Sequence, residues 1–214
     1  MKKRLRNWVV KKLSKYFQVK EVEYFCGKNP YNVILGENSY FEKPRQINGG
    51  NYIIIGNKSS IGHSAWLGAF DSYLNQNFIP EIKIGNNVKI GNYACITAID
   101  KIVIQDGCLM SEYVYISDHY HGFNPTLNIE PAKQSLFSKG KVIIGANTFI
   151  GYRVTILSGV TLGKNCVVGA HSVVNKSFPD YSMIAGVPAK IIKKFSFEKE
   201  DWIDINLANE ETID

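Results

Sequence analysis

An aliphatic residue recurs at every sixth position through most of this chain. The repeat is clearest from Ile144 onward, where the sequence reads I-G-A-N-T-F, I-G-Y-R-V-T, I-L-S-G-V-T, L-G-K-N-C-V, V-G-A-H-S-V. Neither a helix, with period 3.6, nor an ordinary strand, with period 2, produces such a pattern as one long element. A triangular coil does, because each hexad supplies one short strand and one corner. The repeat therefore predicts a solenoid of stacked coils.

The aliphatic positions group into about six coils of three hexads each. They are Leu35, Phe41, Ile47; Ile55, Ile61, Leu67; Ile84, Ile90, Ile96; Ile104, Met110, Ile116; Ile144, Ile150, Ile156; and Leu162, Val168, Val174. Two breaks interrupt them: Asp71–Glu81, expected to be a simple corner loop, and a long excursion over residues 117–141. Parallel strands stack at ~4.8 Å, so each side of the prism becomes a parallel sheet and the fold class is mainly β.

The two ends of the chain differ from the repeat and from each other. Residues 1–20 hold eight Lys or Arg and no acid, with apolar residues at helical spacing, and 195–214 hold seven acids and one Lys. We therefore predict three parts: a basic amphipathic helix and lead-in over 1–32, the β-solenoid over 33–192, and an acidic capping helix and tail over 193–214. Two interpretations of the N-terminal helix stay open: packing on its own domain or a sister subunit, or contact with an anionic membrane.

The net charge of +6 comes from the first 20 residues, which argues against a nucleic-acid-binding surface on the solenoid. No window approaches the ~20 apolar residues of a membrane span, and no secretory signal is visible. The cysteines Cys26, Cys95, Cys108 and Cys166 form no C-x-x-C motif. They are expected to be small core residues in a reduced, cytoplasmic protein, and the basic N-terminus would suit a place at the inner face of the membrane.

The repeat and the segment from Ser158 to Lys194, which includes A-G-V-P-A-K, resemble the hexapeptide-repeat acyltransferases. The likeness is greatest to the sugar O-acetyltransferase branch, which includes galactoside and maltose acetyltransferases. It implies a left-handed parallel β-helix and acetyl-CoA as co-substrate without a metal. It also implies a sugar acceptor, from a surface polysaccharide or its precursor, and a homotrimer with sites between subunits.

Four histidines could act as the general base of such a transfer. His63 and His171 fall at corners and are expected to be solvated. His119 and His121 lie in I-S-D-H-Y-H-G-F, where the repeat fails. The resemblance implies the sixth residue of the hexad before the long loop, which is His121, with His119 as the second choice.

The resemblance also implies residues for the two substrates. Asp118 or Asp100 would orient the imidazole or hold the acceptor, and Tyr120 and Phe149 would line the acceptor site. Phe149 stands where family members commonly carry Trp, and it lacks the indole N–H donor. A backbone N–H near Ile150–Gly151 is the expected oxyanion donor. The residues expected along acetyl-CoA are Gly151, Ala170, Asn175, Lys176, Lys190 and Lys193, with Lys194 as an alternative at the nucleotide end.

Three other functions fit the pattern less well. An N-acetyltransferase of an amino sugar-nucleotide would use the same fold, base and co-substrate. A metal enzyme resembling the gamma carbonic anhydrases would need three histidines, whose expected spacing the chain lacks. A non-catalytic scaffold solenoid would bind no acetyl-CoA.

Overall fold

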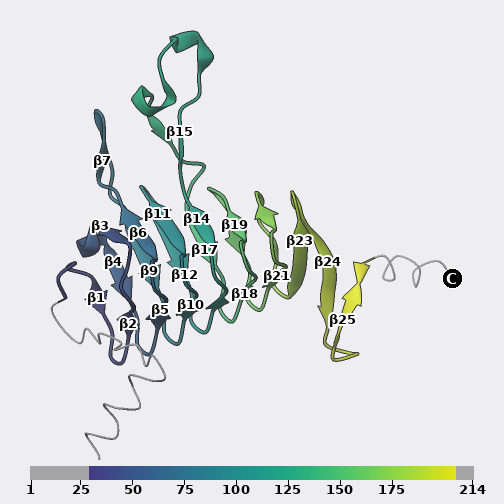
Figure 1. Cartoon of the computed structure of the whole chain (residues 1–214). Helices are drawn as coiled ribbons and strands as arrows, with labels where there is room; N and C mark the ends of the chain where they lie inside the picture. The colour runs from purple at the N-terminus through teal and green to yellow at the C-terminus, as the bar shows by residue number, and fades with distance from the viewer. Residues whose placement is uncertain (1–28, 206–214) are drawn as a thin grey trace, which may run out of the picture.

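The computed structural model describes residues 29–205, which form a three-sided prism of stacked coils (Figure 1). The first face holds β1 (Ile34–Leu35), β4 (Ile53–Ile55), β9 (Glu81–Ile84), β12 (Lys101–Ile104), β17 (Val142–Ile144) and β20 (Thr161–Leu162). The second face begins with β2 (Tyr40–Phe41), β5 (Ser60–Ile61), β10 (Lys89–Ile90), β13 (Leu109–Met110), β18 (Phe149–Ile150) and β21 (Val167–Val168). The third face holds β3 (Gln46–Asn48), β6 (Trp66–Ala69), β11 (Cys95–Ala98), β14 (Tyr115–Ser117), β19 (Thr155–Ile156) and β22 (Val173–Val174). The fold is the left-handed parallel β-helix that the resemblance implies.

The strand register confirms the six coils that the repeat predicts. On the first face Leu35 pairs with Ile55, Ile55 with Ile84, and Ile84 with Ile104. The equivalent hexad residues on the other two faces pair in the same way, for example Met110 with Ile150 and Ile116 with Ile156. Nearly all these side chains are buried in one continuous core. Each aliphatic residue is therefore covered by the other faces of its own coil and by the coils above and below it.

The corners follow different rules. Between the first and second faces, Asn or Asp side chains accept backbone N–H groups of the neighbouring coil, as when Asp106 Oδ1 accepts from Asn86 N at 2.8 Å. These hydrogen bonds hold the pKa of Asp106 below its ordinary value. Between the second and third faces, the left-handed residues are larger ones such as Tyr93 and Tyr113, whose rings stack at 4.6 Å. Glycine and Asn are thus not required at every corner.

All long departures from the prism occur at the corner where the third face passes to the first. The hairpin of β7 (Ser72–Tyr73) and β8 (Gln76–Asn77) leaves there, and so does the excursion that carries β15 (Tyr120–His121) and β16 (Leu136–Phe137). The excursion also contains the 3-10 turns η2 (Pro125–Leu127) and η3 (Pro131–Lys133), and η1 (Gly50–Tyr52) lies between β3 and β4. Figure 1 shows β7 and β15 projecting from the same edge.

The predicted C-terminal capping helix is wrong within the described residues. After β23 (Ser182–Gly186), the chain forms β24 (Ala189–Ser196) and β25 (Asp201–Asp204), two antiparallel strands that extend the second face. Phe195 and Trp202 pair across these strands, with ring centroids 5.5 Å apart. Phe195 and Trp202 therefore cap the prism as part of a hairpin and not of a helix. The predicted N-terminal helix lies outside the described residues.

The predicted burial of the cysteines is confirmed for Cys108 and Cys166, whereas Cys95 is half-buried and Cys26 lies outside the described residues. Burial raises the pKa of the Cys108 thiol from 9.0 to about 11 and also raises the pKa of Cys166. We expect both thiols to resist maleimide at pH 8 in the folded protein, because the thiolate is the reacting form. Peptide mapping after labelling, with and without urea, measures this, and equal rates in both conditions would contradict the buried positions.

Candidate functional site

The site begins where the excursion leaves the fourth coil, at a fully buried carboxylate. The side chain of Asp118 accepts backbone hydrogen bonds from Ile99 N at 3.0 Å and Asp100 N at 2.9 Å. Its carbonyl oxygen accepts from the hydroxyls of Ser138 and Ser158, both at 2.6 Å. Asp118 therefore connects three segments by hydrogen bonds: the turn at Ile99 and Asp100, the end of the excursion at Ser138, and the next coil at Ser158.

His119 is fixed by this carboxylate. Its Nδ1 lies 2.9 Å from Asp118 Oδ1, and its side chain is only 12% exposed. A carboxylate accepts hydrogen bonds, so Nδ1 carries a hydrogen, and in the neutral ring the lone pair is on Nε2. The ring meets Phe70 edge-to-face at 6.3 Å. His119 is thus well oriented but largely enclosed.

His121 lies on the excursion and is exposed. The regular third-face strand ends at Ser117, so the hexad counted from Ile116 does not continue along the coil. Instead His121 pairs with Leu136 between β15 and β16. Its Nδ1 lies 3.4 Å from the hydroxyl of Tyr73, on the hairpin from the second coil. The excursion and the hairpin, not the coil, therefore set the position of this imidazole.

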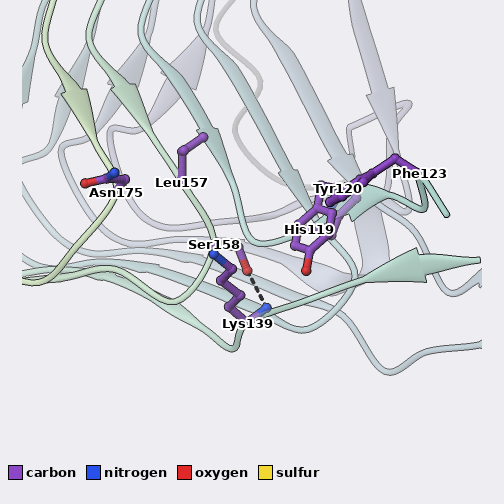
Figure 2. A pocket seen from close by; sticks show the side chains of 7 residues that line it. All are labelled: His119, Tyr120, Phe123, Lys139, Leu157, Ser158 and Asn175. Atoms are coloured by element: carbon purple, nitrogen blue, oxygen red, sulfur yellow. Dashed lines mark hydrogen bonds between the residues drawn. The ribbon is translucent and has the colours of Figure 1, made fainter. Parts of the chain in front are cut away.

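Two cavities meet at the histidines. The first, which we call the Asn175 cavity, has a volume of about 270 Å³, and Figure 2 shows Asn175 on the side opposite Phe123. It is lined by His119, Tyr120, Phe123, Lys139, Leu157, Ser158 and Asn175. The second, the Trp66 cavity, has a volume of about 280 Å³. It is lined by Trp66, Phe70, Tyr73, Cys95, Thr97, Tyr115, His119, Tyr120, His121 and Leu136. His119 and Tyr120 line both, so two molecules bound side by side would meet there.

The described chain brings together only part of the predicted set. His119, Tyr120 and Asn175 line one cavity, and Asp118 lies beneath them. Asp100 is exposed and contributes its backbone N–H to Asp118. Phe149 is on the second face, 38% exposed, and lines neither cavity. The residues predicted to bind the acceptor therefore do not lie together in one chain: Phe149 is on the second face, whereas Asp100 and Tyr120 are at the corner after the third face.

The residues predicted to bind acetyl-CoA also lie in different surroundings. Gly151 and Ala170 lie at the corner after the second face, where a Cβ on Gly151 would approach Ala170 N to 2.7 Å. Coil stacking alone therefore explains this glycine. Its N–H donates to Val168 O at 2.9 Å, so the expected oxyanion donor is already occupied. Of the lysines, Lys176 and Lys190 are exposed, whereas Lys193 Nζ lies 3.4 Å from Asp204 Oδ2.

Several residues of the site carry no sequence signal that would have found them. Tyr73 lies in the break predicted to be a simple corner loop, which is instead a hairpin packed on the excursion. Lys139 returns from the excursion with its N–H bonded to Ser158 Oγ at 2.7 Å, as the dashed line in Figure 2 shows. Only the breaks in the repeat mark these segments, and they do not indicate that the segments touch.

Neither of the other histidines lies at the excursion. His63 contacts Tyr93 and His171 contacts Tyr152 at the corner between the second and third faces. Among residues 29–205, no three His, Cys, Asp or Glu side chains are grouped so that they could hold a metal ion. The same residues contain no helix long and apolar enough to span a bilayer.

Comparisons with known proteins agree with this architecture. The bacterial transferase hexapeptide family (six repeats) matches residues 141–176. The "Putative lipopolysaccharide biosynthesis O-acetyl transferase WbbJ" of Escherichia coli K12 is 40% identical over 127 residues, which are 56% of this chain and 64% of that protein. The "Probable acetyltransferase Rv3034c" of Mycobacterium tuberculosis is 39% identical over 113 residues, 52% of this chain and 37% of that protein. The chain thus spans less than two thirds of the length of both.

Solved structures share the fold. AntD, an N-acyltransferase from Bacillus cereus in complex with dTDP and 3-hydroxybutyryl-CoA, has a TM-score of 0.64 at 23% identity, covering 84% of this chain and 90% of that chain. The polySia specific acetyltransferase NeuO has a TM-score of 0.51 at 24% identity, covering 76% and 81%. At these identities the likeness concerns the fold. The family match over residues 141–176 and the sequence relatives show that the chain is similar to hexapeptide-repeat transferases.

Proposed function

We propose that the protein transfers an acetyl group from acetyl-CoA to a hydroxyl of a sugar, in a surface polysaccharide or its precursor. The observation that carries the proposal is the meeting of two cavities at the histidines of the excursion. Acyl transfer needs a donor and an acceptor side by side with a base between them. The names of the relatives, an O-acetyl transferase of lipopolysaccharide biosynthesis and an acetyltransferase, support the same reaction class.

The Asn175 cavity suits the acyl donor. Its walls combine the apolar Leu157 with the amide of Asn175 and the ammonium group of Lys139, which match a thioester arm that carries amides. Lys176 and Lys190 are exposed cations near the C-terminal end of the prism, where their charges suit phosphates; Lys176 Nζ lies over the Phe178 ring, 5.6 Å from its centroid. Lys193 is a weaker candidate because Asp204 already offsets its charge. Acetyl-CoA, when bound, supplies the activated acetyl group.

The Trp66 cavity suits the acceptor. Trp66, Phe70 and Tyr115 give it aromatic walls, which favour the apolar faces of a sugar ring. Asp100 and Tyr120 lie at the same corner and would bind its hydroxyls. His121, exposed beside this cavity, is the proposed base, and His119 is the second choice because Asp118 and the coil enclose it.

In the proposed mechanism, Nε2 of His121 takes the proton of the acceptor hydroxyl as its oxygen bonds to the acetyl carbonyl carbon. The carbon–sulfur bond of the thioester then breaks, and His121 returns the proton to the leaving sulfur. No covalent enzyme intermediate is needed. Gly151 N–H is engaged within its own chain, so the oxyanion requires another donor, for which Lys139 in the Asn175 cavity has suitable chemistry.

A homotrimer is part of the proposal. Phe149, Gly151 and Ala170 lie on the second face and its following corner, away from the histidines of the same chain. A second copy packed against the excursion would add these residues to the site. The exposure of Phe149 is consistent with such a role, since large exposed aromatic residues favour interfaces.

The direct test is an acceptor screen with acetyl-CoA, following free thiol by a chromogenic reagent. We expect acceptor-dependent thiol release and an acetylated product from which hydroxylamine removes the acetyl group, because an ester is cleaved and an amide is not. A hydroxylamine-stable product would instead identify N-acetyl transfer to an amino sugar. Failure to bind acetyl-CoA in calorimetry would overturn the proposal and favour a scaffold.

A further inference from the structure

We infer that Tyr73, on the β7–β8 hairpin, is a positioning residue that sets the tautomer of His121; this rests on the proposed role of His121 as the base. The two residues are 48 positions apart in the sequence and belong to departures from different coils. Their rings meet edge-to-face with centroids 5.4 Å apart. The Tyr73 hydroxyl lies 3.4 Å from His121 Nδ1, a long hydrogen bond of the kind that often tightens when substrates bind.

The donor inventory decides the direction of this hydrogen bond. A tyrosine hydroxyl has a single hydrogen. Tyr73 donates it to the carbonyl oxygen of Ala132 at 2.5 Å, the shorter of its two contacts. Toward His121 the same oxygen can then only accept, so His121 Nδ1 must carry the hydrogen. The lone pair of the neutral ring is left on Nε2, the atom that a general base needs to have free.

A second contact, between Gln76 and Leu136, fixes the hairpin against the excursion and so holds Tyr73 beside His121. The side chain of Gln76 donates to Leu136 O at 3.1 Å and accepts from Leu136 N at 2.7 Å. Leu136 is buried and is the residue paired with His121 across β15 and β16. The hairpin therefore contacts the excursion at two points: Gln76 binds the backbone of Leu136, and Tyr73 contacts the imidazole of His121.

This arrangement gives the break at Asp71–Glu81 a function. A loop that only turned a corner would not need a tyrosine aimed at a histidine of another coil. His119 is oriented by Asp118 and His121 by Tyr73, so different side chains orient the two histidines. Removing the Tyr73 hydroxyl should thus affect His121 and leave His119 unchanged.

The test is Tyr73→Phe, which keeps the ring and removes the hydroxyl. In protein labelled with 15N-histidine, the wild-type His121, assigned by its loss in His121→Gln, is expected to show a protonated Nδ1 and an unprotonated Nε2. In Tyr73→Phe we expect the ring to change toward the Nε2–H form, while His119 keeps its spectrum. The kcat of acetyl transfer should fall about tenfold, roughly the value of one hydrogen bond, with KM within about twofold.

The matched control is Tyr52→Phe. Tyr52 donates to Asp71 at 3.2 Å, at the root of the same hairpin, and does not contact His121. This variant should keep the wild-type spectrum and kcat. If His121 in the wild type carries its hydrogen on Nε2, or if Tyr73→Phe leaves the tautomer unchanged, the inference is wrong. Because the spectrum needs no turnover, its outcome is separate from whether the proposed transfer reaction is found.

Discussion

Replacing His121 by alanine is expected to lower kcat for acetyl transfer about a thousandfold, the middle of the range for removing a general base. The physical reason is that no other group beside the Trp66 cavity combines an exposed imidazole with a free Nε2. Acetyl-CoA binding should change little, because His121 does not line the Asn175 cavity. Steady-state kinetics, with calorimetry for acetyl-CoA, measure both quantities.

The control for this experiment is His119→Ala. We expect it to reduce kcat by about tenfold or less, since in the proposed mechanism its ring shapes both cavities without moving the proton. Thermal melting should show that both variants fold. If His119→Ala abolishes transfer and His121→Ala retains it, the roles are reversed, and the enclosed, carboxylate-bound histidine is the base.

The second large effect is expected from Asp118→Ala. The substitution leaves two backbone N–H groups, the buried one of Ile99 and the partly buried one of Asp100, without their acceptor. An unsatisfied buried donor costs about 1–3 kcal/mol, so the free energy of unfolding should fall by about 3 kcal/mol. Activity should be lost as well, because the root of the excursion that carries His121 depends on the same carboxylate. Urea denaturation followed by circular dichroism measures the loss of stability.

Asp100→Ala is the matched control for that variant. Asp100 is the exposed neighbour whose N–H, not its carboxylate, contacts Asp118. Its replacement should change the free energy of unfolding by less than about 0.5 kcal/mol. Equal losses in the two variants would show that the buried carboxylate of Asp118 is not the anchor that its hydrogen bonds indicate.

The local sequence pattern predicted the coils of the prism correctly, but it predicted the wrong secondary structure for the segment that follows the last coil. The segment Phe195–Leu207 has apolar residues that fit a helix, and isolated spacing favoured that interpretation. The exposed edge strand β23 offers a row of unpaired backbone groups, and pairing with it stabilises β24 and β25 instead. A tertiary partner thus overrides the local preference of the segment.

In the site, too, the sequence pattern located some residues and missed others. His119, His121 and Asp118 could be found because they stand where the repeat fails, and a rigid coil holds a departing loop firmly at its root. Tyr73 could not be found, because its break in the repeat gives no information about which other break it contacts. The same limit applies to Phe149, which lies on a different face from the histidines.

The sequence by itself determined the prism, since an aliphatic residue at every sixth position can be buried only when coils stack in register, and all eighteen positions do so. Only the tertiary structure decided how the breaks in that repeat combine. Contacts between two departures 48 residues apart depend on the shape of the corner from which both project, and no periodicity carries that information.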